Sequence, residues 1–447
     1  MLSSTRRRHP FGVAIAAALM WGIGLVAASS GASAQQLIYD DEIENLLDDY
    51  ARPIFKAAGL NNGHITMRII NDPTFNAFVL DGRNVFIHTG TLMQADTPNQ
   101  VIGVIAHEVG HIDGAHLAAL RAEMQRVQTG MILTRVIGIA AAVLARNSAA
   151  AFAADDPWLK TFLARRRQQE SSADQAGVRF LTRTHQSGRG MLETFEKLGI
   201  ENRAYGVNPY LLSHPTERTR IAHLRDAVQR SPYYNTKDSP ALQLRHDLVR
   251  AKLRGFTLPA QDVVNLYRND NSLPARYARA IAANCSGNCT RAIGQIDELI
   301  KAAPQNPYFW ELKGHVYARE GKSAQAIPAL RQTLKLGGNR SHLVKTELAR
   351  MLVSSSNPAY LDEAIRLLEV MLDTNEEASG YSLLARAYAA KGREAEAEVA
   401  MAYAHLQRGN NKQAIIFAKR AQRKLKVGSR AWRKADDIIK TTPAGDR

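Results

Sequence analysis

The pentapeptide His107-Glu108-Val109-Gly110-His111 is the part of the sequence that indicates chemistry most directly. Residues four apart lie on one face of an α-helix, so the imidazoles of His107 and His111 can bind one Zn²⁺ ion. Glu108 lies one position round the helix, where its carboxylate can reach a water molecule beside the metal. The alternative is a pair of solvated helix histidines, but apolar residues at helical spacing flank the motif and favour a buried site. We therefore predict metal-assisted hydrolysis with Glu108 as the general base.

A third ligand is required, because a catalytic zinc ion is held by three protein side chains and keeps an open position for water. Glu170 and Asp174 are four residues apart and share a face of another predicted helix. We expect Glu170 to be the third ligand and Asp174 to support a ligand by a hydrogen bond. Alone, such an acidic pair is usually a solvated helix face, so this prediction depends on the histidine motif. His116 is expected off the ligand face, as a surface or supporting histidine.

A further histidine, His214, lies in Ser213-His214-Pro215, outside any predicted helix. Neutral imidazole binds zinc well, so His214 as a fourth ligand would displace the catalytic water and hold the enzyme latent. Its competing role is to stabilise the oxyanion of the tetrahedral intermediate by donating a hydrogen bond to it, with help from Arg220. An ordinary loop histidine next to proline is the third possibility. The residues alone leave these alternatives open.

Two predicted helices must position these side chains. Thr97 and Pro98 are typical of the start of the helix that carries His107, and a second helix carries Glu170. The expected elements are helices over 41–58, 99–125 and 157–184 and strands over 65–70, 77–80 and 85–88. The last strand either presents an edge to which an extended substrate adds or is an ordinary internal strand.

Two apolar segments raise the question of a membrane. Residues 11–28 follow three arginines and precede Ala32-Ser33-Ala34, which is the layout of a signal peptide cleaved after Ala34. The alternative is an uncleaved anchor, because the run approaches the length that spans a bilayer. Residues 131–145 are too few to span one. We expect a buried helix or a flap near the site there, with an interfacial membrane helix as the alternative.

Composition restricts the partners. The 447 residues are 45% hydrophobic and 22% charged, which is typical of globular protein and too long for one compact core. With a net charge of +16, an exported chain is attracted to an anionic membrane surface or an acidic protein rather than to nucleic acid. Cys285 and Cys289 either form a disulfide in an oxidising compartment or remain thiols, and they lack the second ligand pair of a metal site.

Recurring small residues mark the C-terminal half. Their spacing is near the tetratricopeptide period of about 34 residues, and they stand at Ala292-Ile293, Ala326-Ile327, Ala364-Ile365 and Ala397. A generic helical bundle is the alternative, but small residues where paired helices approach closely favour a solenoid. We therefore divide the chain into a signal peptide (1–34), a metallopeptidase domain (35–230) and a tetratricopeptide-repeat domain (231–447).

These segments together resemble the zinc metallopeptidase family that includes the CAAX prenyl endopeptidases and the membrane heat-shock protease HtpX. The resemblance covers about residues 41–226, and it departs at Arg166 or Arg167, where the family often places a serine-arginine step before the glutamate. The segments that carry it are Asn76-Ala77-Phe78, Val85-Phe86-Ile87-His88-Thr89-Gly90, Ala106-His107-Glu108-Val109-Gly110-His111, Glu170-x-x-Ala173-Asp174, His214-Pro215 and Arg220-Ile221.

Pattern and resemblance together predict a mostly α fold with a small β-sheet, in which a zincin-type metallopeptidase domain precedes an α-helical tetratricopeptide-repeat solenoid. An exported, repeat-bearing member of the family implies a periplasmic metalloendopeptidase with one Zn²⁺ per chain. Its clients would be misfolded or stalled proteins in outer-membrane β-barrel assembly, and its repeats would contact the β-barrel assembly machinery. The resemblance also implies that His214 acts as a switch that controls the activity.

Two other activities are compatible with the sequence. A periplasmic chaperone or adaptor would act mainly through the repeats, but the intact Glu108 argues against a dead site. A membrane-surface protein would use the basic residues near the C-terminus, which are otherwise a solvated helix face. These basic residues are Lys412, Lys419, Arg420, Arg423, Lys424, Lys426, Arg430, Arg433 and Lys434.

Overall fold

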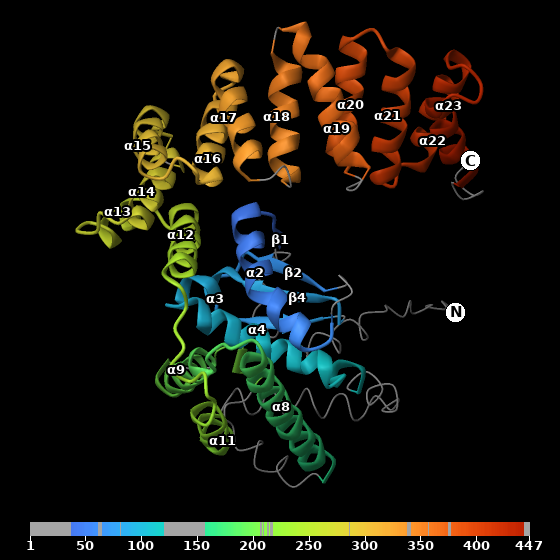
Figure 1. Ribbon diagram of the computed structural model, residues 1–447. Helices are drawn as coiled ribbons and strands as arrows, with labels where there is room; N and C mark the ends of the chain where they lie inside the picture. Colours follow the sequence, from blue (N-terminus) through green and yellow to red (C-terminus); the bar gives the residue numbers. More distant parts are fainter. Residues whose placement is uncertain are drawn as a thin grey trace, which may run out of the picture. The chain divides into compact units, whose positions relative to one another are not determined.

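The computed structural model (Figure 1) divides the chain into two compact units, Met1–Leu253 and Arg254–Arg447. The residues that the structure describes are 37–60, 65–80, 82–119, 157–205, 208, 210–211, 214, 218–285, 287–337, 341–355, 357–373 and 377–441. The expected signal peptide and the apolar segment 131–145 lie outside these residues. Within the described ranges, no helix has the length and apolar character needed to cross a membrane.

A four-stranded sheet with the order β1-β2-β4-β3 lies in the first unit. Its strands are β1 (Leu37–Ile38), β2 (Thr66–Ile70), β3 (Ala77–Val79) and β4 (Asn84–His88). β4 pairs in parallel with β2, with Ile87 opposite Ile69, and it pairs antiparallel with β3. Because β4 has a partner on each side, residues 85–88 form an ordinary internal strand, which is the second of the two predicted alternatives. Its hairpin partner β3 lies at the edge instead.

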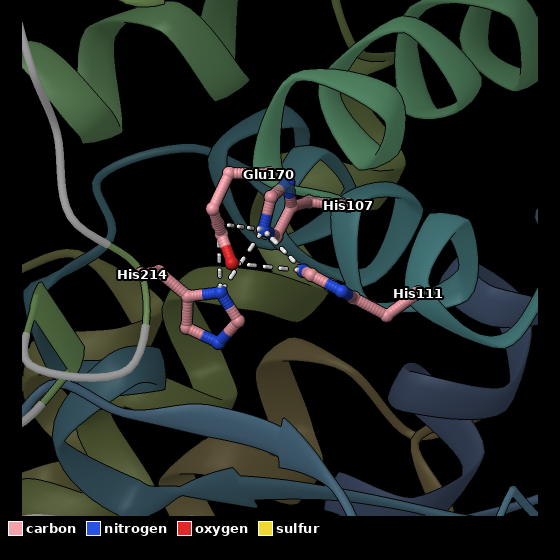
Figure 2. A group of neighbouring side chains, drawn as sticks. All are labelled: His107, His111, Glu170 and His214. Carbon is pink, nitrogen blue, oxygen red and sulfur yellow. Dashed lines mark hydrogen bonds and ion pairs between the residues drawn. The ribbon is translucent and has the colours of Figure 1, made fainter. Parts of the chain in front are cut away.

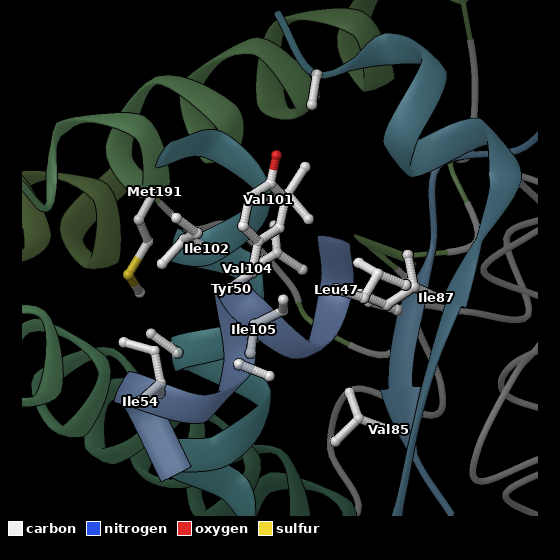
Figure 3. Close-up of a cluster of buried hydrophobic side chains, with 14 of the residues drawn as sticks. Leu47, Tyr50, Ile54, Val85, Ile87, Val101, Ile102, Val104, Ile105 and Met191 are labelled. Carbon is white, nitrogen blue, oxygen red and sulfur yellow. The ribbon is translucent and has the colours of Figure 1, made fainter. Parts of the chain in front are cut away.

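The core of the first unit joins this sheet to its helices. Asp40 starts the first helix, because its carboxylate accepts a hydrogen bond from the amide of Ile43 at 3.1 Å. Figure 3 shows Leu47, Val104 and Ile87, from two helices and β4, in one buried cluster. The helices of this unit are α2 (Asp41–Ala57), α3 (Thr89–Gln94), α4 (Pro98–Asp113), α8 (Pro157–Arg183), α9 (Arg189–Tyr205), α11 (Arg218–Gln229) and most of α12 (Pro240–Thr257).

The two helices that carry the site motifs, α4 and α8, approach closely because each has a glycine where they cross. A Cβ atom on Gly110 of α4 would lie 2.6 Å from the carbonyl oxygen of Ala173 of α8. A Cβ atom on Gly177 of α8 would lie 3.2 Å from the carbonyl carbon of Ala106 of α4. No larger side chain fits at Gly110 unless the helices move apart.

α4 ends at Asp113, so the prediction of one helix from 99 to 125 is wrong. Gly114 follows the helix, and Ala115 has a φ of +49°, in the left-handed region that residues other than glycine rarely adopt. Residues 116–119 then form a separate helical turn. A Cβ atom on Gly114 would lie 2.3 Å from Nε2 of His116, so the glycine leaves room for that ring.

The second unit is helical throughout its described residues, which confirms the predicted fold class. Ala292 and Ala326 are fully buried in α15 and α17, where successive helices pack against one another. The assignment of these helices to tetratricopeptide repeats stays a prediction. They are α13 (Ala260–Leu266), α14 (Leu273–Cys285), α15 (Cys289–Ala302), α16 (Pro307–Arg319), α17 (Ser323–Leu336), α18 (His342–Ser354), the 3₁₀ helix η1 (Pro358–Tyr360), α19 (Leu361–Leu372), α20 (Ala378–Ala390), α21 (Glu394–Gln407), α22 (Asn411–Lys424) and α23 (Arg430–Thr441).

The structure bears on two details of the predicted organisation. The compact units divide after Leu253, while the predicted boundary is near residue 231, because Val249 in the middle of α12 packs in the core of the first unit. Cys289 is a free thiol whose sulfur accepts a hydrogen bond from Arg319 at 3.2 Å. The side chain of Cys285 lies outside the described residues.

Candidate metal centre

Four side chains from three segments of the first unit meet at one point (Figure 2). His107 and His111 come from α4, Glu170 comes from α8, and His214 lies between α9 and α11. One ligand atom of each lies within 4.8 Å of the others. The side chains of His107 and Glu170 are buried, so their polar atoms have lost water and need other partners. The structure therefore brings the three predicted ligands together with His214.

The spacing of the donor atoms fits a tetrahedral zinc ion. Nε2 of His107 lies 3.1 Å from Nε2 of His111, 3.4 Å from Oε2 of Glu170 and 3.3 Å from Nδ1 of His214. Ligand atoms about 2.0–2.1 Å from zinc stand roughly 3.3 Å apart at tetrahedral angles. Oε1 of Glu170 is buried and has no hydrogen-bond partner among the described residues, as a carboxylate reserved for a metal would be. The residues present therefore fit one zinc ion.

Further contacts orient these side chains. Nδ1 of His107 lies 2.9 Å from Oδ1 of Asp174, a contact typical of zinc histidines. Arg220 donates hydrogen bonds of 2.7 and 2.9 Å to the two oxygens of Asp174, and it lies 3.0 Å from Oε2 of Glu170. Burial alone would raise the pKa of Asp174, but the Arg220 guanidinium holds it below its usual range. Arg220 is thus bound to two carboxylates, and a direct role at the oxyanion stays a prediction.

His116 contacts the side of His111 that faces away from the cluster. The Nδ1 atoms of the two rings are 3.0 Å apart, and the rings meet edge-on with centroids 5.0 Å apart. A hydrogen bond from Nδ1–H of His111 to His116 leaves the lone pair of Nε2 directed at the cluster. The sequence reasoning left the role of His116 undecided, because in a helix continued beyond Asp113 this ring would lie off the ligand face.

Glu108 lies beside the cluster and is 1% exposed. Burial raises the pKa of its carboxyl above the usual value, which suits a general base. Its Oε1 accepts a hydrogen bond of 3.5 Å from the hydroxyl of Tyr210 and lies 3.6 Å from Nε2 of His214. Tyr210 was not among the predicted site residues, because a single tyrosine outside any motif carries no signal beyond its position four residues before His214.

Comparison with known proteins identifies the part of the chain that contains this centre. Residues 40–228 match the family described as Peptidase family M48. This part of the chain belongs to peptidase family M48. The M48 domain contains all four clustered residues, together with Glu108, Asp174 and Arg220.

Relatives resemble more of the chain than the M48 domain. The "Beta-barrel assembly-enhancing protease" of Escherichia coli (strain K12) is 26% identical over 379 residues, which cover 81% of this chain and 75% of that protein. The "Putative beta-barrel assembly-enhancing protease" of Vibrio cholerae serotype O1 is 25% identical over 452 residues, covering 93% of this chain and 90% of the relative. The "Mitochondrial metalloendopeptidase OMA1" of Saccharomyces cerevisiae is 26% identical over 198 residues, 41% of this chain and 54% of its own length.

These findings confirm the predicted enzyme class and cofactor. The chain is a metalloprotease with an M48 domain at residues 40–228, and zinc is its metal. The two bacterial alignments cover 81% and 93% of this chain, which is more than the first unit contains, so the similarity continues into the helical second unit.

Proposed function

We propose that this chain is a periplasmic zinc metalloendopeptidase that hydrolyses misfolded or stalled clients during outer-membrane β-barrel assembly. The observation that carries the proposal is the cluster of His107, His111, Glu170 and His214, with buried Glu108 beside it. The names of the two bacterial relatives support the cellular role, because their alignments cover most of both chains. A chaperone or adaptor is not favoured, since such a protein has no need of a buried general base at a metal site.

Each residue of the site has its own part in the proposed reaction. His107, His111 and Glu170 hold the metal, and Asp174 and Arg220 keep His107 and Glu170 oriented. When bound, zinc polarises the scissile carbonyl and acidifies the water that attacks it. Glu108 accepts the proton from that water and donates it to the leaving amine. Tyr210 helps to orient the Glu108 carboxylate.

His214 serves as a latch in this proposal. Its Nδ1 lies 3.1 Å from Oε2 of Glu170 and 3.3 Å from Nε2 of His107, at the fourth corner of the donor set. A fourth protein ligand leaves no position for water, and catalytic zinc sites require one. His214 must therefore leave this position before the bond is cleaved. The competing role, a hydrogen bond donated to the oxyanion, requires His214 to face the substrate instead.

Strand β3 is the proposed recognition edge for an extended substrate. It lies at the edge of the sheet and packs against α4, the helix that carries Glu108. Main-chain hydrogen bonds from a substrate strand added there would give binding with little sequence selectivity. Misfolded proteins expose such extended segments, so this edge matches the proposed clients.

The remaining partners follow from the sequence and the relatives. We propose export by residues 1–34 and contact of the helical unit with the β-barrel assembly machinery. Some of the basic residues near the C-terminus already have acidic partners, since Arg420 and Lys424 both lie close to Glu398. Peripheral contact with an anionic membrane would depend on the basic residues near the C-terminus that have no acidic partner among the described residues.

The proposal is tested with an unfolded outer-membrane β-barrel protein as substrate. The purified chain should cleave it, should lose this activity when a chelator removes zinc, and should regain it when zinc is restored. The same client folded in detergent is the control and should be spared. Cleavage that persists after complete zinc removal would contradict the proposal.

A further inference from the structure

A pocket of about 410 Å³ lies wholly within the second unit. It is lined by residues from the end of α19, from α20 and α21, and from the start of α23 with the connection before it. Ligand pockets span roughly 300–1,000 Å³, so this one has the volume of a binding site. None of the residues of the metal centre contributes to it.

Aromatic and apolar side chains form much of this pocket. Tyr381 and Tyr403 stack with ring centroids 4.9 Å apart and planes inclined by 15°. Tyr388 lines the same space, and the guanidinium of Arg393 stands 4.4 Å from the centre of its ring. Leu384 is a buried neighbour in the lining. Rigid aromatic surface of this kind buries large apolar side chains at low entropic cost.

The acidic side chains that line the pocket have partners, whereas two of its lysines have no acidic partner among the described residues. Each of its three acids has a partner, and the pairs are Glu369 with the hydroxyl of Tyr388, Asp373 with Arg430, and Glu396 with Arg393. Lys426 and Lys434 also line the pocket, and neither has an acidic partner within the part of the chain that the structure describes. Two ammonium groups beside apolar surface, with the local acids already engaged, favour an incoming carboxylate.

We propose that this pocket binds a segment of a client polypeptide in which a large apolar or aromatic side chain stands next to a carboxylate. The side chain enters among the three tyrosines, and the carboxylate meets Lys426 and Lys434. This inference rests on the proposed function, because that function makes the ligands of the chain polypeptides. It adds the side-chain chemistry that the helical unit recognises in a client. In the proposed function, the M48 domain binds the main chain of the client through β3.

Peptide binding to the full-length Glu108→Gln protein, which should cleave the probe far more slowly than the wild type, tests the proposal. The probe is a fluorescein-labelled peptide with one phenylalanine between two glutamates. Binding should saturate and weaken as salt is raised, because charged groups attract it. Adding Lys426→Glu and Lys434→Glu should weaken it by at least about tenfold, since two charge-assisted contacts are lost.

The matched control is the pair Lys412→Glu and Lys419→Glu. These lysines are exposed on α22 outside the pocket, so the double change alters the net charge equally but should leave affinity within about twofold. Ala431→Leu narrows the pocket without a change of charge and should also weaken binding. Equal weakening by both lysine pairs, or unchanged affinity when alanine replaces the phenylalanine of the probe, would overturn the proposal.

Cleavage of denatured casein by the wild-type chain tests the protease function separately. If casein is cleaved in a zinc-dependent way but the probe does not bind, the pocket proposal fails and the proposed function stands. If casein is not cleaved, the proposed function fails whatever the probe does.

Discussion

Gly110 sets the distance between the two helices that carry the metal centre, and we predict that Gly110→Ala damages the centre more than the fold. The new Cβ atom would lie 2.6 Å from the carbonyl oxygen of Ala173 and 2.9 Å from its Cα atom. Ordinary contact begins at 3.4 Å, so α4 and α8 must separate by about 0.8 Å, the difference between 3.4 and 2.6 Å. Glu170 lies one turn before Ala173 on α8 and moves with that helix.

The expected loss of zinc binding and of rate follows from how little the metal centre tolerates a shift of its ligands. Metal–ligand distances vary by only about 0.2 Å in good sites, so Glu170 would no longer bind zinc together with His107 in the same geometry. A misplacement of about 1 Å at an active site lowers the rate roughly 100-fold. The fold should lose less, because overpacking costs about 1–3 kcal/mol and the better helix propensity of alanine returns about 1 kcal/mol.

Three measurements decide this prediction: zinc affinity by competition with a chelator, casein cleavage, and unfolding in urea. Gly110→Ala should bind zinc more weakly and cleave about 100-fold more slowly, with a modest loss of stability. The matched control is Gly294→Ala in α15, where a Cβ atom meets nothing within 4 Å. It should gain up to about 1 kcal/mol and leave both functions unchanged. Normal zinc affinity and turnover in Gly110→Ala would refute the role of the helix crossing.

Three further predictions concern histidines. His214→Ala should keep zinc and cleave clients less selectively if His214 is a latch, or lose orders of magnitude in turnover if it serves the oxyanion; unchanged basal cleavage and turnover would exclude both roles. His116→Ala should weaken zinc affinity roughly 10- to 100-fold, and His116→Asn, which keeps an acceptor near the position of Nδ1, should restore most of it; equal affinities in a chelator competition would remove His116 from the centre. His246 lies buried between the hydroxyl of Tyr50 and the carbonyl oxygen of Ala95, and burial lowers its pKa to about 4. Since the unfolded chain, with a pKa of about 6.5, takes up this proton first, the stability that His246 contributes is present above pH 6.5 and declines toward pH 4, by about 2 kcal/mol at pH 5. Urea unfolding of His246→Gln should show that much less pH dependence between pH 7 and 5, and an identical slope would contradict the assignment.

The parts of the centre that sequence patterns could predict are those with local signals. His107, Glu108 and His111 follow from helical spacing, and Glu170 follows from the acid pair on the next helix. Tyr210 had no such signal, because it reaches the centre only through tertiary packing.

The errors and open alternatives in the predicted fold arise from contacts between segments distant in sequence or from local strain. Strand order depends on the parallel pairing of β2 with β4, which no local pattern encodes, so the sequence left open whether residues 85–88 form an edge strand or an internal one. The apolar pattern of α4 does not predict that the helix ends at Asp113. The left-handed conformation of Ala115 accompanies the packing of His116 against His111, and helix propensity does not predict it.

The Glu108→Gln protein provides the most direct test of the central claim, that a buried glutamate beside one zinc ion activates the attacking water. Glutamine keeps the size of the side chain and leaves all proposed ligands in place, so the purified variant should bind one zinc ion per chain with wild-type affinity. Its cleavage of denatured casein should fall by about 100- to 10,000-fold, because the general base is gone. Cleavage by the zinc-loaded variant at a rate near that of the wild type would contradict the account.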